Sequence, residues 1–190
     1  MKKNFLFMMV LLFISGSAFA QTVDTVAILS PSMHKTIKTV VVLPASYDKS
    51  PDKKYPVVYL LHGHGGNYAV YVNQTRPELP QDVSQMECIA VCPDGGKNSW
   101  YWDSPADPKN RYETFVAEEL VKYIDEHYRT IADRTGRAIT GFSMGGHERR
   151  RRYPPLPRPM GYETVARRIL KIPQSVERPY RHHPTLSSAS

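Results

Sequence analysis

One continuous apolar run, residues 55–61, most constrains the fold of this chain. A strand that is apolar at nearly every position is buried on both faces, which is typical of a parallel sheet covered by helices. Runs at 22–29, 36–43, 87–92 and 137–140 predict four further strands. We therefore predict an α/β architecture with a mostly parallel sheet.

The clearest helix is predicted for residues 112–130. Five apolar side chains share one face of it, at i, i+4, i+7, i+8 and i+12: Val116, Leu120, Tyr123, Ile124 and Tyr128. Residues 67–86 have a mixed pattern that Pro77 and Pro80 interrupt. A chain of 190 residues suggests a single domain.

Residues 137–147 contain the most informative motif. Gly141, Ser143 and Gly145 have the G-x-S-x-G spacing of a nucleophile elbow, and a β-branched strand precedes them, as that turn requires. In such an elbow the serine stands on a tight strand-to-helix turn with its hydroxyl exposed. Side chains two residues to either side would collide with neighbouring backbone, so glycine is favoured there. Ser143 is therefore the candidate nucleophile.

A glycine-rich loop, residues 62–66, follows the strand at 55–61. In an architecture with a nucleophile elbow, such a loop and the residue after the nucleophile together supply the N–H groups of an oxyanion hole. Here these donors would be the N–H groups of His64 and Met144. A phosphate cradle or a plain turn is the alternative interpretation of the loop, but neither accounts for the serine motif.

Four other residues allow two interpretations. Trp100 and Tyr101 would either line a substrate cleft or form a hydrophobic plug under the sheet edge. Asp94 and Asp103 are acids near the motifs, but both precede the serine, whereas the acid of such a site follows it. Turn-forming roles are therefore favoured for the two aspartates.

The two cysteines, Cys88 and Cys92, lie in one predicted strand. Their Cα atoms would be ~13 Å apart in an extended chain. A disulfide requires a separation below about 7 Å. We therefore expect two buried thiols.

In combination these motifs resemble one known family. The segments YPVVYLLHG at 55–63, CPDG at 92–95, NSWY at 98–101 and GFSMGGH at 141–147 look like motifs of the putative-esterase family, in the same order. That family includes esterase D, feruloyl and acetyl-xylan esterases, and the antigen 85 mycolyltransferases. The resemblance implies an α/β-hydrolase fold, acyl-enzyme chemistry on carboxylic esters, and a catalytic Asp or Glu and then a His downstream of the serine.

The resemblance stops after residue 147. Residues 149–152 are four consecutive arginines, so in a helix at least one would be buried without a partner. Residues 148–190 hold nine Arg and one Lys against three Glu, which accounts for the whole net charge of +7. The same segment holds seven Pro, a composition typical of disorder. We expect a fold truncated after the elbow and a disordered or frameshifted tail at 148–190. An intact reading frame across codon 148, found by resequencing, would contradict the frameshift.

A serine hydroxyl needs a general base within hydrogen-bond reach. His62 and His64 lie in the glycine-rich loop, where a loop-shaping role is favoured. His147 lies one turn past the serine, and His182 and His183 follow in the Arg-rich tail. The acids that follow the serine are Glu148, Glu163 and Glu177. The sequence alone identifies neither the base nor the acid.

The N-terminus has the pattern of an export signal. Lys2 and Lys3 precede an apolar run from 5 to 14, and residues 18–20, Ala-Phe-Ala, fit the small-x-small cleavage rule. The run is shorter than the about 20 residues of a membrane-spanning helix. We therefore predict a signal peptide at 1–20, no membrane anchor, and a secreted or periplasmic protein.

Residues 21–147 are thus expected to be the N-terminal part of an esterase domain. The predicted function is a secreted serine esterase acting on carbohydrate-linked or other small acyl esters. The alternative is a catalytically inactive fragment or a binding module that lacks the triad histidine and acid. No cofactor is expected, and no metal, because His62 and His64 lack further ligands nearby. Export disfavours a specific nucleic-acid partner for the basic tail, and the oligomeric state is left open.

Overall fold

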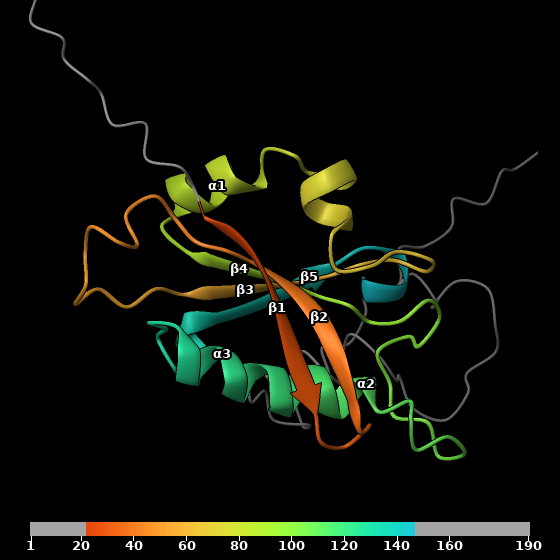
Figure 1. The fold of residues 1–190 in the computed structure, drawn as a ribbon. Helices are drawn as coiled ribbons and strands as arrows, with labels where there is room; N and C mark the ends of the chain where they lie inside the picture. The colour runs from red at the N-terminus through yellow and green to blue at the C-terminus, as the bar shows by residue number, and fades with distance from the viewer. Residues whose placement is uncertain (1–21, 147–190) are drawn as a thin grey trace, which may run out of the picture.

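The computed structural model describes residues 22–146, which form a five-stranded sheet with helices on both faces (Figure 1). The strands are Val23–Ser30 (β1), Lys35–Val42 (β2), Val57–Leu61 (β3), Ile89–Pro93 (β4) and Arg137–Gly141 (β5). The helical segments are Tyr71–Thr75 (η1), Leu79–Met86 (α1), Tyr112–Thr114 (α2), Phe115–Leu120 (η2), Val121–His127 (α3), Arg134–Gly136 (η3) and Ser143–Gly145 (η4). The predicted signal peptide and the tail at 148–190 lie outside the described residues.

All five predicted strands are present, each within two residues of its predicted bounds. The spatial order is β1-β2-β4-β3-β5. Strand β3 pairs in parallel with both β4 and β5, which confirms the parallel centre of the predicted sheet. Strands β1 and β2 pair antiparallel, and β2 also runs antiparallel to β4. The four-residue connection 31–34 requires the antiparallel pairing of β1 with β2, because a short turn joins only antiparallel strands.

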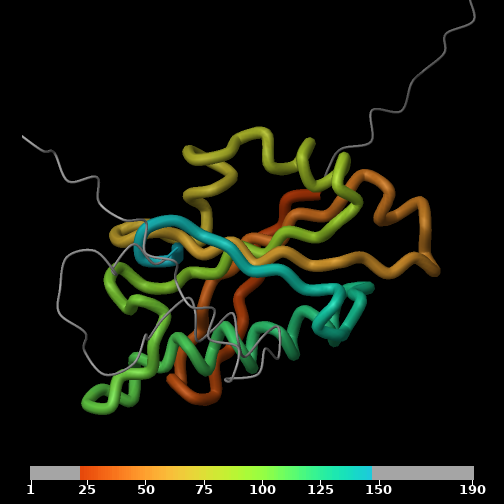
Figure 2. Tube along the Cα trace, turned by 180° about the vertical axis from the view of Figure 1, so that it is seen from behind, coloured from red at the N-terminus to blue at the C-terminus, as the bar shows by residue number. Residues whose placement is uncertain are grey.

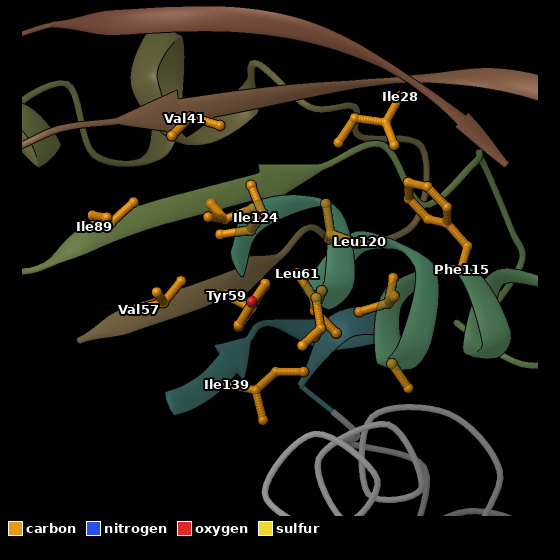
Figure 3. Packing of buried hydrophobic residues seen from close by; sticks show 14 of the residues in the cluster. Ile28, Val41, Val57, Tyr59, Leu61, Ile89, Phe115, Leu120, Ile124 and Ile139 are labelled. Atoms are coloured by element: carbon orange, nitrogen blue, oxygen red, sulfur yellow. The ribbon is translucent and has the colours of Figure 1, made fainter. Parts of the chain in front are cut away.

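The core has two parts, one on each face of the sheet. In β3, Val57, Tyr59 and Leu61 face the helix at 112–127, whereas Leu60 belongs to the cluster beneath η1 and α1. Figure 3 shows Leu120 and Ile124 directed toward these strand residues. Burying each such aliphatic side chain stabilises the fold by about 2 kcal/mol. The continuous apolar pattern of β3 therefore reflects burial on both faces.

The predicted helix is confirmed, but it ends at His127 instead of residue 130. Val116, Leu120 and Ile124 are fully buried, while Tyr123 and Tyr128 are partly buried at the edge of the cluster. Tyr128 leaves the helix in an extended conformation, with ψ 155°. The apolar stripe therefore continues for one residue beyond the helix itself.

The segment 67–86 is more helical than predicted. Pro80 does not interrupt a helix there; it lies in the first turn of α1. Proline is favoured at that position because the first N–H groups of a helix have no intrahelical acceptor. Leu79 and Val83 of this helix are buried against the sheet.

Cys88 and Cys92 are both free and buried, as expected from their spacing. Burial raises the pKa of the Cys92 thiol to about 12. Within residues 22–146, no helix has the length and apolar character needed to cross a membrane.

A largely buried ion pair joins the start of β5 to α3. The Arg137 guanidinium donates a hydrogen bond to Asp125, whose other oxygen accepts one from the Thr130 hydroxyl at 2.7 Å. The Arg137 and Asp125 side chains are only 7% and 17% exposed. This pair therefore fixes the end of β5 that lies opposite the serine motif.

Removing one partner of this pair tests its role in stability. We expect Asp125→Ala to lower the free energy of unfolding by about 3–5 kcal/mol, because it leaves the Arg137 charge buried without its carboxylate. Glu126→Ala is the matched control on the same helix. It removes an exposed ion pair in which the Lys122 side chain is 75% exposed and the Glu126 side chain 55% exposed. Such a pair contributes about 0.5 kcal/mol. Equal losses in urea unfolding of the two variants would contradict this account.

Candidate active site

The serine motif forms a tight turn at the end of β5. Gly141 is the last residue of the strand, and Ser143 begins the short helix η4. Ser143 has a φ of 51°, in the left-handed region that residues other than glycine rarely adopt. It is also exposed. A strained backbone that presents a hydroxyl to solvent is the geometry expected of a nucleophile elbow.

The glycines of the motif are required by close backbone contacts. A Cβ atom on Gly141 would lie 2.4 Å from the Leu61 carbonyl oxygen, and one on Gly145 would lie 2.2 Å from the same atom. A Cβ atom on Gly146 would lie 2.4 Å from the Gly141 carbonyl oxygen. All three distances are too short for a real side chain. The turn therefore packs directly on the end of β3, as the G-x-S-x-G spacing predicts.

The glycine-rich loop begins where the elbow packs. Leu61, the last residue of β3, lies opposite Gly141 in the parallel register. The Phe142 N–H donates to the Leu61 carbonyl at 3.4 Å. In Figures 1 and 2 the blue end of the described chain lies beside the gold loop that follows β3. The two predicted motifs are thus neighbours in space.

The two predicted oxyanion donors are both available. Among the residues that the structure describes, the N–H groups of His64 and Met144 donate no hydrogen bond to another residue. The N–H group that follows each of them is occupied: Gly65 donates to the Lys97 carbonyl at 2.8 Å, and Gly145 to the Phe142 carbonyl at 2.9 Å. Free N–H groups at neighbouring strand ends are what an oxyanion hole needs.

Phe142 is a site residue that the sequence did not single out. Its ring lies against Gly63, where an added Cβ atom would be 2.6 Å from the ring. It also meets the Tyr71 ring edge-on, with centroids 5.8 Å apart, and remains 42% exposed. Phe142 therefore packs the elbow against the glycine-rich loop. The position between the first glycine and the serine of the motif tolerates many residues, so the sequence carried no signal for this contact.

His62 has a structural place in the loop. Its ring nitrogens contact the Gly63 carbonyl and the Gly95 N–H, each at 2.8 Å. Burial lowers its pKa, opposed by the Gly63 contact and by Asp94. Both ring nitrogens are engaged, so His62 is unsuited to act as the base for Ser143. The loop-shaping role favoured from the sequence matches this geometry.

The two aromatic residues after β4 differ in role: one is a hydrophobic plug, and the other is still a candidate for the wall of a substrate cleft. Tyr101 is 0% exposed, and its ring lies edge-on to His62 with centroids 5.7 Å apart. It fills the space over Gly95, so of the two interpretations the plug fits Tyr101 and the wall of an open cleft does not. Trp100 is half-buried at the edge of the core and stays a candidate for a cleft wall.

The two aspartates considered earlier serve as turn and helix caps. The Asp94 carboxylate accepts from the Gly96 N–H at 2.8 Å. The Asp103 carboxylate accepts from both the N–H and the hydroxyl of Thr114, at the start of the long helix. Both carboxylates are therefore held in local structure, as expected from their place before the serine.

Within residues 22–146 the Ser143 hydroxyl has no hydrogen-bond partner, and no His, Cys, Asp and Glu cluster could hold a metal ion. Except for His64 of the glycine-rich loop, the remaining histidines and the downstream acids considered for the triad lie outside the described residues. They are His147, His182, His183, Glu148, Glu163 and Glu177. The described part thus contains the candidate nucleophile and oxyanion donors of a serine hydrolase.

Comparison with known proteins agrees with this arrangement. An esterase of Mycobacterium tuberculosis is 38% identical over 109 residues, which cover 56% of this chain and 23% of the relative. An endo-1,4-β-xylanase/feruloyl esterase of Xylanibacter ruminicola is 31% identical over 135 residues, covering 66% of this chain and 19% of the relative. The chain thus spans about a quarter or less of the length of these curated relatives.

A solved ferulic acid esterase structure shares the fold, with a TM-score of 0.58 and 35% identity, over 67% of this chain and 50% of its own. It confirms the predicted α/β-hydrolase fold. The family model described as Putative esterase matches residues 30–148, more than half of the chain. The chain belongs to this esterase family.

Proposed function

We propose that the chain hydrolyses carboxylic esters through an acyl-enzyme on Ser143. One observation carries the proposal: Ser143 is exposed in a left-handed turn packed on the end of β3, and within the described residues the N–H groups of Met144 and of His64 in the adjoining loop donate no hydrogen bond. The names of the relatives, esterase and feruloyl esterase, support ester hydrolysis as the reaction.

In the proposed reaction the Ser143 oxygen attacks the ester carbonyl carbon and loses its proton to a general base. The carbonyl oxygen becomes an oxyanion that accepts hydrogen bonds from the His64 and Met144 N–H groups. Each such donor contributes about 3 kcal/mol to stabilising the transition state. The alcohol then leaves with a proton, and water releases the acid from the serine ester. His62 is not this base, because both of its ring nitrogens are engaged in the loop.

We further propose that the substrates are carbohydrate-linked or other small acyl esters and that the protein is secreted. A feruloyl esterase joined to a xylanase and an acetyl esterase of Caldicellulosiruptor saccharolyticus, 29% identical over 127 residues, support this substrate class. The sequence pattern at 1–20 supports export. Half-buried Trp100 is the residue we assign to the wall of the cleft.

A second candidate function is a binding module without catalysis. It is favoured by the unbonded Ser143 hydroxyl in the described part of the chain, because a serine without a base is a weak nucleophile. In that case the elbow and loop would present an ester-binding surface and turn over no substrate.

Hydrolysis of p-nitrophenyl acetate separates the two functions. We expect a burst of p-nitrophenol that disappears in Ser143→Ala, because the burst reports formation of the acyl-serine. Ser50→Ala is the control; it removes a hydroxyl in the connection between β2 and β3 and should leave the burst unchanged. An equal rate in Ser143→Ala and the parent chain would favour the binding module.

A further inference from the structure

The imidazole of His62 joins the two loops that follow β3 and β4. His62 is the first residue after β3, and its side chain is 1% exposed. Its Nε2 atom accepts a hydrogen bond from the Gly95 N–H at 2.8 Å, across to the loop after β4. A second bond, from the Gly65 N–H to the Lys97 carbonyl at 2.8 Å, joins the same two loops. His64 lies between these two connections.

The geometry fixes the protonation state of this ring. A backbone N–H only donates, so Nε2 must be the unprotonated nitrogen that receives it. The single proton of the neutral ring is therefore on Nδ1, which donates to the Gly63 carbonyl at 2.8 Å. Adding a proton to Nε2 would replace the acceptor by a donor. The Gly95 N–H would then lose its partner.

An alternative partner for a protonated ring is already in place. The Asp94 Oδ1 atom lies 4.0 Å from His62 Nε2. This carboxylate and the edge-on Tyr101 ring are the ionisable groups that face the imidazole from the neighbouring loop. A small rotation would let the protonated Nε2 donate to Asp94 and leave Gly95. A second arrangement of the ring, with one more proton, is thus within reach of the one that the structure shows.

We propose that His62 is a positioning residue that makes the oxyanion loop sensitive to pH. The neutral ring holds the loop at 62–66 to the loop at 94–97, and protonation releases Gly95 and loosens the backbone that carries the His64 N–H. The catalytic consequence rests on the proposed function of His64, but the coupling of the two loops does not.

The direction of the pH effect follows from proton linkage. Burial holds the pKa of His62 in the closed loop below its ordinary value of about 6.5. Once the Gly95 contact opens, the ring regains that ordinary pKa and binds a proton more readily. Opening therefore becomes easier as the pH falls below about 6.5, by up to tenfold per pH unit, until the lowered pKa of the closed state is reached.

Amide hydrogen exchange of Gly95 in the full chain tests this coupling. The protection factor, which corrects for the intrinsic pH dependence of exchange, should fall by up to tenfold per unit below pH 6.5. His62→Gln keeps an acceptor for the Gly95 N–H but does not titrate, so its protection should be independent of pH. His127→Gln is the control, because His127 contacts only Tyr123 on its own helix among the described residues; it should keep the parent slope.

Two results would overturn the proposal. One is a Gly95 protection factor that does not change between pH 6.5 and 5 in the parent chain, or that falls equally in His62→Gln. The other is an imidazole ¹⁵N spectrum at neutral pH that places the proton on Nε2, a measurement that needs no variant. Neither readout depends on ester turnover, so a failure of Ser143 to act as nucleophile would be recognised separately.

Discussion

The candidate site depends on the close parallel approach of β3 and β5. Leu61 lies opposite Gly141, and its carbonyl oxygen is so near the turn that neither Gly141 nor Gly145 has room for a side chain. This contact sets the elbow on the end of β3 and directs the chain through the left-handed conformation at Ser143. It also places the glycine-rich loop beside the serine, because that loop starts from the same strand end. Nucleophile and oxyanion donors therefore follow from one strand pairing.

Much of this arrangement could be predicted because its signals are local. Burial on both faces leaves β3 continuously apolar, and the stripe from Val116 to Ile124 has the helical period. The glycines of the serine motif indicate a tight turn, because a side chain at either position would collide with backbone. The antiparallel placement of β2 beside β4, by contrast, joins strands far apart in the sequence, so no local pattern indicates it. Pro80 was expected to interrupt its segment but lies in the first turn of α1, because a proline is tolerated at the start of a helix.

The contacts around the loop could not be predicted, because they join residues far apart in the sequence. The bond from Gly95 to His62 spans 33 residues, and Tyr101 is buried against the same histidine. A histidine in a glycine-rich loop has the same appearance in sequence whether it binds a substrate or holds two loops together. Only its two occupied nitrogens distinguish the roles. Residues 22–146 thus contain everything that places the serine. They do not identify the base that would activate it.

The most direct test of this account is the reaction of the chain with a fluorophosphonate, followed by peptide mass spectrometry. A serine in a formed elbow attacks the phosphorus and displaces fluoride, and the neighbouring N–H groups stabilise the developing charge on the phosphonyl oxygen. The account predicts a single phosphonyl adduct on Ser143 that is lost when the chain is unfolded in urea before the probe is added. No adduct, or adducts spread over several serines regardless of folding, would contradict it.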